Sequence, residues 1–353
     1  MKTLLKIGAI LLITIMVGIV VLVGVIVVKS PGKTLPIDGE NAISELIQIE
    51  LGGMKQWVLI RGYNKNNPVL LILHGGPGSP ELAMHRKYNS ALEKHFTVIN
   101  WEQRGSCKSY NKGIPKDTMK IPVFVSDARE LVQYLKKRFN TQKIFLEGHS
   151  WGSAIGALLV QQIPQDIKAY IAIGEASDVI ENEIAGYDRA MAEAKKRNNK
   201  AAIKELSAIG RPPYQELKKT GVERKWVMQF GGTVKNGAMQ MIASALFNCR
   251  EYTAADKILN YAQGSLFSLT SLWPEILEGN MYKSALEWKV PVYIMAGRHD
   301  ATVVYALQEK YFNFIKAPKK YFFTFENSAH MCAYEEPEKY LDIMVNKVLK
   351  ENK

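Results

Sequence analysis

Short apolar runs rich in β-branched residues alternate with helical stretches along most of the chain. A strand that is apolar at nearly every position must be covered on both faces, as in parallel sheets flanked by helices. The runs that we interpret as strands are residues 55–62, 68–74, 96–101, 143–148, 168–174, 291–297 and 320–325. Their alternation with helical segments predicts an α/β fold with a mostly parallel, doubly wound sheet.

A long region without strand-like runs, residues 179–287, separates the last two predicted strands from the others. Its composition, rich in Ala, Glu and Lys, favours helices. In an open α/β sheet the ligand crevice lies beyond the carboxyl ends of the strands, so an insertion after residue 174 would cover that crevice. We therefore predict a core in two parts, 43–178 and 288–353, with a helical cap at 179–287.

The N-terminal segment has a different composition from the rest of the chain. The run from Ile7 to Val28 carries no charge and exceeds the about 20 apolar residues that a membrane crossing needs. No Ala-x-Ala cleavage pattern follows it, so we expect one uncleaved transmembrane helix within residues 1–29, followed by a linker at 30–42. The flanking lysines favour a cytoplasmic N-terminus, which predicts a single-pass membrane protein with an extracytoplasmic catalytic domain.

Charge and cysteine content exclude several classes of partner and ligand. The net charge is +12, but the basic residues are scattered among acids, which indicates a lysine-rich surface and no nucleic-acid partner. The cysteines Cys107, Cys249 and Cys332 lack the spacing of a zinc site or a disulfide framework, and their role stays open. We predict no cofactor and no metal, and the oligomeric state stays open.

The stretch EGHSWGSAIG, residues 147–156, follows the apolar run KIFL and precedes the helical run ALLVQQI. Gly148 and Gly152 flank Ser150, and glycines at these positions allow the sharp strand-to-helix turn that exposes a nucleophilic serine. The same five-residue pattern also fits an ordinary crossover that happens to contain serine. Residues elsewhere in the chain must therefore decide between these readings.

A nucleophilic serine needs a base, a carboxylate that orients the base, and donors for the oxyanion. His330 follows the last predicted strand, and Asp300 follows the strand before it, so both should lie at the sheet edge that carries Ser150. The order Ser150, Asp300, His330 is that of α/β-hydrolases. The backbone N–H groups of Gly76, in LHGGPGSP, and of Trp151 are the expected oxyanion donors.

The motifs HGGPG (74–78), WEQRGSCKS (101–109), GHSWG (148–152), GRHD (297–300) and SAH (328–330) together resemble those of the proline iminopeptidase family of α/β-hydrolases. The resemblance extends from about Ile43 to Leu349. It implies an α/β-hydrolase fold with a helical cap, a Ser150–Asp300–His330 triad, and an oxyanion hole at Gly76 and Trp151.

Two positions depart from the family pattern. Glu102 stands where the family has aspartate, and the segment EASD (175–178) replaces an arginine-containing stretch. Release of an N-terminal residue requires acids that bind the free amine, and no motif in the cap identifies them. The candidates by location are Glu175, Glu181, Glu183 and Glu251.

These features predict a membrane-anchored serine hydrolase that acts on a small molecule or short peptide and cleaves the amide bond of its N-terminal residue. The alternative within the same chemistry is a carboxylester or lactone hydrolase. Its acyl pocket would be lined by aromatic side chains of the cap, namely Trp226, Phe230, Phe247, Phe267 and Trp273. A third reading is a catalytically inactive binding protein, because fold alone does not fix function.

Overall fold

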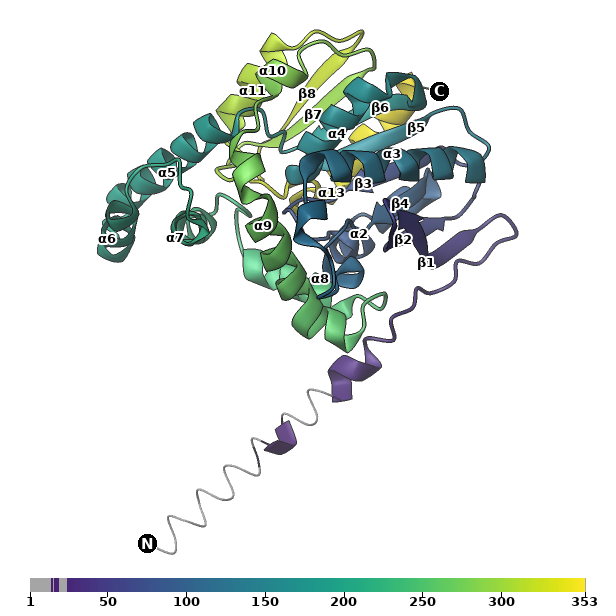
Figure 1. Cartoon of the computed structure of the whole chain (residues 1–353), viewed down its shortest axis with the longest axis horizontal. Coiled ribbons are helices and arrows are strands. Elements are labelled where there is room, and N and C mark those ends of the chain that lie inside the picture. The colour runs from purple at the N-terminus through teal and green to yellow at the C-terminus, as the bar shows by residue number, and fades with distance from the viewer. Residues whose placement is uncertain (1–13, 15, 19–23, 353) are drawn as a thin grey trace, which may run out of the picture.

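An eight-stranded sheet forms the centre of the molecule (Figure 1). The structure, a computed structural model, describes residues 14, 16–18 and 24–352. The strand order is β1-β2-β4-β3-β5-β6-β7-β8. Strand β2 is antiparallel to β1 and β4, and all other neighbours are parallel, which confirms the predicted mostly parallel sheet. The strands are β1 (Ile43–Leu51), β2 (Met54–Gly62), β3 (Val69–Leu73), β4 (Thr97–Trp101), β5 (Ile144–His149), β6 (Ile167–Ile173), β7 (Val292–Gly297) and β8 (Lys320–Phe325).

Helices cover both faces of the sheet. Strand β3 shows why: Leu71 and Leu73 pack in one apolar cluster and Leu70 and Ile72 in the other, because successive side chains point to opposite faces. The first cluster includes residues of α3 (Ile121–Arg138), α4 (Trp151–Gln162) and α11 (Tyr305–Phe314). The second includes residues of η1 (Ser90–Lys94), α12 (Cys332–Glu335), α13 (Pro337–Asp342) and η6 (Ile343–Leu349).

Strand β1 was not among the predicted strands. Its sequence, ISELIQIEL, alternates apolar and polar residues, and it pairs on one side only, with β2, at the end of the strand order. Most of its residues are half-buried, since its outer face contacts solvent. An edge strand of this kind has no continuous apolar run by which it could be recognised.

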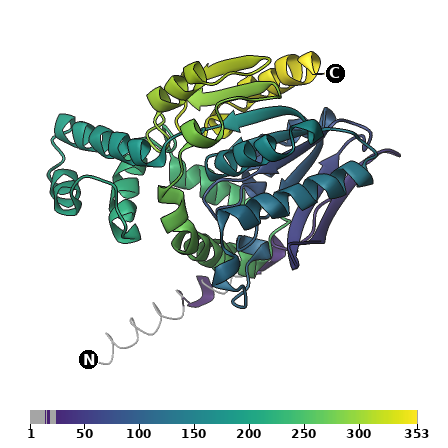
Figure 2. The same ribbon diagram turned by 45° about the horizontal axis from the view of Figure 1, so that its top comes forward.

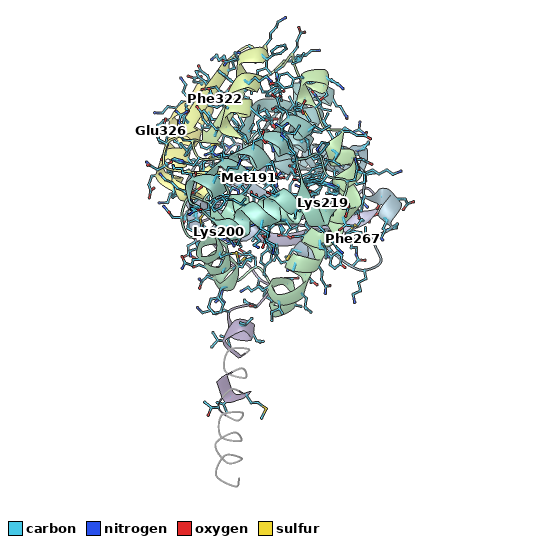
Figure 3. The ribbon with its side chains drawn as sticks, turned by 90° about the vertical axis from the view of Figure 1, so that its left-hand side faces the viewer. Met191, Lys200, Lys219, Phe267, Phe322 and Glu326 are labelled. Atoms are coloured by element: carbon cyan, nitrogen blue, oxygen red, sulfur yellow. The ribbon has the colours of Figure 1, made fainter. Side chains whose placement is uncertain are left out.

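Helices fill the chain between β6 and β7, where the cap was predicted. They are α5 (Val179–Lys196), α6 (Lys200–Ile209), α7 (Leu217–Gln229), α8 (Ala238–Asn248), α9 (Tyr261–Leu277) and α10 (Met281–Ser284), with the π-helical turn η5 (Asp256–Asn260). Figures 1 and 2 show α5, α6 and α7 projecting as an arm to one side of the sheet, while α8 and α9 lie closer to the core. Figure 3 views this arm from its outer side, with Met191 of α5, Lys200 of α6 and Lys219 of α7 toward the viewer. The exact cap boundaries remain a prediction.

The predicted transmembrane helix is wrong. Among the described residues, no helix combines the length and the apolar composition that crossing a bilayer requires. Within the predicted span the structure describes residues 14, 16–18 and 24–29. The rest of that predicted span lies outside the described residues. The predicted single-pass membrane localisation, extracytoplasmic domain and membrane association rested on this helix and are corrected with it.

Residues 31–35, within the predicted linker, are bound to the folded domain. Pro31 forms a β-bridge with Thr253, and the Lys33 backbone N–H donates to the Arg250 carbonyl. The buried guanidinium of Arg61 donates from Nη1 to the Thr34 hydroxyl at 2.5 Å and to the Leu35 carbonyl at 2.6 Å. This segment therefore packs between the sheet edge and the cap.

Candidate active site

Ser150 lies at the turn between β5 and α4, in a strained backbone conformation. Its φ of 52° and ψ of −119° are unusual for a residue with a side chain. The Ser150 N–H donates to the Ile173 carbonyl at 2.9 Å. A Cβ at Gly152 would lie 2.0 Å from the Leu73 carbonyl oxygen, and one at Gly148 would lie 2.4 Å from the Gly152 oxygen. The two glycines therefore allow the close approach that this turn requires, as expected for a nucleophile elbow.

Asp300 and His330 meet in the loops that follow β7 and β8. The His330 Nδ1 donates to the Asp300 Oδ2 at 2.9 Å, and both side chains are buried. Asp300 Oδ1 accepts the backbone N–H groups of Thr302 and Val303 at 2.9 and 2.8 Å. Gln308 Nε2 donates to Oδ2 at 3.1 Å. Four donors therefore surround this carboxylate, which fixes its orientation.

The loop after β3 presents Gly76 beside the elbow. The His74 Nδ1 donates to the Gly75 carbonyl at 2.8 Å, and its Nε2 accepts the Gln103 N–H at 3.2 Å, so His74 is a neutral imidazole. Burial lowers its pKa to about 4, which agrees with this state. Because the Gly75–Gly76 peptide is planar, holding the Gly75 carbonyl also sets the direction of the Gly76 N–H. Trp151 begins α4, where backbone N–H groups lack partners within the helix.

A pocket of about 860 Å³ connects the elbow to the cap. Its lining includes Gly76, Ser150 and Trp151 from the core and Glu183, Arg224 and Trp273 from the cap. Of the five aromatic residues considered for an acyl pocket, Trp273 is in this lining, whereas Trp226 and Phe230 pack within the arm. The pocket volume lies in the range of small-molecule and short-peptide sites.

Glu183 is the member of the four acid candidates that lines this pocket. Its side chain is buried and pairs through Oε1 with Arg224, while Oε2 has no hydrogen-bond partner among the residues that the structure describes. Arg224 Nη1 also donates to the Thr302 carbonyl at 3.2 Å, beside the Asp300 loop. Although burial opposes its charge, the carboxylates of Glu183 and Glu223 raise the pKa of Arg224.

The other three candidates lie outside the pocket. Glu181 is partly exposed and pairs with Lys310 at 2.7 Å. Glu251 forms an ion pair with Arg86 at 3.0 Å, near the N-terminal segment. Glu175 is fully buried beneath the site, where burial raises its pKa to about 8.

Two polar residues outside the predicted triad organise the site. Gln103 Oε1 accepts the indole N–H of Trp151 at 3.0 Å, and its Nε2 donates to the His74 carbonyl. Arg189 of α5 donates to the carbonyls of His299 and Asp300 and so ties the cap to the acid loop. Gln103 lies within the motif WEQRGSCKS, although its sequence does not show this contact, whereas Arg189 lies in no recognised motif and only the fold brings it to the acid loop.

Glu102, the departure from the family pattern, is buried under the cap. It accepts the Tyr252 hydroxyl at 2.5 Å and the Lys108 backbone N–H at 3.2 Å. Burial raises its pKa to about 7. Its carboxylate therefore joins the loop after β4 to the chain before η5.

Comparison with known proteins agrees with this architecture. Residues 68–337 match the alpha/beta hydrolase fold family. The chain is 32% identical over 310 residues to the probable aminopeptidase YbaC of Bacillus subtilis, spanning 86% of this chain and 96% of the relative. It is 25% identical over 299 residues to the proline iminopeptidase of Heyndrickxia coagulans, spanning 80% and 90% of the two chains. The solved structure of Mycobacterium smegmatis proline iminopeptidase superposes with a TM-score of 0.65 at 17% identity, over 87% of this chain and 99% of that one, which shows the fold alone.

The chain belongs to the α/β-hydrolase fold family and is a hydrolase. Within this family it is proline iminopeptidase-like, as its motifs predicted. The reading as a catalytically inactive binding protein is therefore not supported.

Proposed function

We propose that the protein is a serine aminopeptidase that releases the N-terminal residue of a short peptide or a related amide. The observation that carries this proposal is that Glu183 and Ser150 line one pocket, with a carboxylate oxygen of Glu183 unpartnered among the described residues. A substrate ammonium would supply a donor to this oxygen, which the ion pair with Arg224 leaves without one. The similarity to aminopeptidases supports the same substrate class.

In this mechanism Ser150 Oγ attacks the scissile carbonyl carbon while His330 takes the hydroxyl proton. Asp300 holds the His330 Nδ1–H and stabilises the imidazolium that forms. The N–H groups of Gly76 and Trp151 bind the oxyanion of the tetrahedral intermediate. His330 then gives its proton to the leaving amine, the C–N bond breaks, and an acyl-enzyme remains on Ser150. Water, deprotonated by His330, hydrolyses this ester and releases the N-terminal residue.

Labelling with a fluorophosphonate tests the nucleophile. The wild-type chain should react covalently, and the Ser150→Ala variant should not. Equal labelling of the two proteins would refute the assignment of Ser150.

Turnover of matched substrates tests the free-amine requirement. An alanyl or prolyl arylamide should be cleaved, and its N-acetylated form should be cleaved far more slowly. Comparable rates on both would contradict the aminopeptidase proposal, and faster turnover of a short-chain aryl ester would favour the ester or lactone hydrolase.

Glu183→Gln should lower kcat/KM on the free-amine substrate by roughly 10- to 100-fold, since hydrogen bonds to charged groups contribute about 1.5–3 kcal/mol. Its rate of fluorophosphonate labelling should stay near that of wild type. Glu181→Gln is the matched control, because Glu181 lies on the same helix but pairs with Lys310 outside the pocket. Equal losses in both variants would remove Glu183 from the amine site.

A further inference from the structure

A second buried ion pair lies directly beneath the proposed triad. The carboxylate of Glu81, in the loop after β3, contacts His149, the residue before Ser150. Their Oε1 and Nδ1 atoms are 2.5 Å apart, and the residues are 6% and 3% exposed. The proposed mechanism gives neither residue a chemical role.

The hydrogen-bond partners of both residues fit a charged pair. Glu81 Oε1 also accepts the Gly75 N–H at 3.1 Å, and Oε2 accepts the Tyr334 hydroxyl at 2.9 Å, as an ionised carboxylate does. The His149 Nε2 lies 3.1 Å from the His330 carbonyl oxygen, which can only accept. Beside an ionised Glu81, both ring nitrogens of His149 face acceptors, and the imidazolium carries a proton on each.

The electrostatics of the two groups agree with this geometry. Burial opposes the charged form of His149, but the carboxylate of Glu81 raises its pKa overall. Burial likewise opposes the charge of Glu81, yet His149 helps to lower its pKa to about 2. Both pKa shifts favour the charged form of the pair.

The pair contacts three segments whose relative positions matter for the proposed chemistry. Glu81 holds the N–H of Gly75, which precedes the oxyanion donor Gly76. His149 precedes Ser150, and it holds the backbone of His330, whose ring lies 4.7 Å from its own at an angle of 37°. Tyr334, at the helix after His330, adds a second link to Glu81.

We propose that the Glu81–His149 ion pair is a positioning device that sets the oxyanion loop and the His330 loop relative to Ser150. This proposal rests on the proposed role of Ser150 as nucleophile. A neutral His149 has only one N–H donor. It can therefore donate to the Glu81 carboxylate or to the His330 carbonyl, but not to both.

Other titratable groups face the pair and must be considered in a pH experiment. Burial lowers the pKa of His85, like that of His74, to about 4, so both are neutral at and above neutral pH. Burial raises the pKa of Glu147 to about 7, and its ionisation there places negative charge near His149. The remaining groups are Asp300 and His330 on the triad side and the hydroxyls of Tyr261, Tyr334 and Tyr340.

The rate of inactivation by a fluorophosphonate, measured against pH, tests the proposal without a substrate. In wild type the rate should fall at least about tenfold at alkaline pH, as His149 loses its proton. The ¹⁵N NMR titration of the His149 ring in the full chain should show both nitrogens protonated at neutral pH and the same alkaline midpoint. A neutral His149 at pH 7, or two different midpoints, would overturn the proposal even if no variant folds.

Glu81→Gln separates positioning from general stability. It should react at least about tenfold more slowly at pH 7 and lose the alkaline fall, because its His149 is no longer held in the charged form. Glu93→Gln is the matched control: Glu93 is also 6% exposed and pairs with Arg61 at 3.1 Å, but it lies on η1, outside the pocket lining. It should keep both the wild-type rate and the alkaline fall.

Failure of the nucleophile assignment and failure of the positioning role give different outcomes. A wild-type chain that does not react at all would refute the nucleophile itself. A reactive wild type with Glu81→Gln at the same rate, or Glu93→Gln equally slow, would refute the positioning role alone.

Discussion

Replacing Asp300 by asparagine tests the His330 tautomer on which the proposed mechanism depends. Asp300 Oδ1 accepts two backbone N–H groups, from Thr302 and Val303. Only the oxygen of an asparagine can take that place, so its NH₂ group must occupy the position of Oδ2, opposite the His330 Nδ1. An NH₂ group there donates to Nδ1 and moves the ring proton to Nε2. The nitrogen that should accept the Ser150 proton is then already protonated.

The expected loss is about 10⁴-fold in kcat, the size known for this change in a Ser-His-Asp triad. At about 1.36 kcal/mol per tenfold, this is about 5.4 kcal/mol of transition-state stabilisation. The assay is steady-state turnover of the arylamide together with the rate of fluorophosphonate inactivation, and both should fall while KM changes little.

Asp166→Asn is the control for loss of a buried carboxylate. Asp166 is 5% exposed and accepts from Gln133 at 2.8 Å, but it precedes β6 at the opposite end of the sheet. It should retain the wild-type rate. A folded Asp300→Asn variant that loses less than about tenfold, or an equal loss in Asp166→Asn, would refute the reasoning from the tautomer.

Two further predictions concern stability. Gly152→Ala should destabilise the fold by about 1–3 kcal/mol in urea unfolding, because its Cβ would meet the Leu73 carbonyl at 2.0 Å. Gly221→Ala in α7, with no atom within 4 Å of the new Cβ, should instead stabilise it by about 0.5–1 kcal/mol, and the reverse order would contradict this packing argument. Burial raises the pKa of Glu175 from 4.5 to about 8, so the folded chain binds this proton more tightly than the unfolded chain, and stability falls as pH rises between these values. Glu175→Gln lacks this titration, so its unfolding free energy relative to wild type should rise by roughly 3–5 kcal/mol between about pH 5 and about pH 9; a difference independent of pH would contradict the buried, protonated carboxyl.

The sequence predicted the sheet and the order of the triad candidates because both depend on local patterns. Each strand from β2 to β8 is a run that can be recognised on its own, and Asp300 and His330 follow such runs directly. The alternating edge strand β1 lacked that signal.

The parts of the site that were not predicted depend on contacts between distant segments. Glu81 and His149 are 68 positions apart, and Glu183 could not be told from Glu181 until the structure placed Glu183 in the pocket lining. The apolar N-terminal run led to a prediction that was wrong. Its composition alone indicated a transmembrane helix, and the described residues contain none.

The attachment of residues 31–35 to the domain determines where the chain can be shortened for expression. A fragment that begins at residue 43, where the first strand begins, would lack the Thr34 and Leu35 acceptors of Arg61. Arg61 is only 5% exposed. It would also free the Arg250 carbonyl and Thr253 next to η5. A fragment that begins at residue 30 keeps all of these contacts. The soundest N-terminal boundary for a recombinant fragment is therefore residue 30, ahead of the bound segment, and not the start of the first strand.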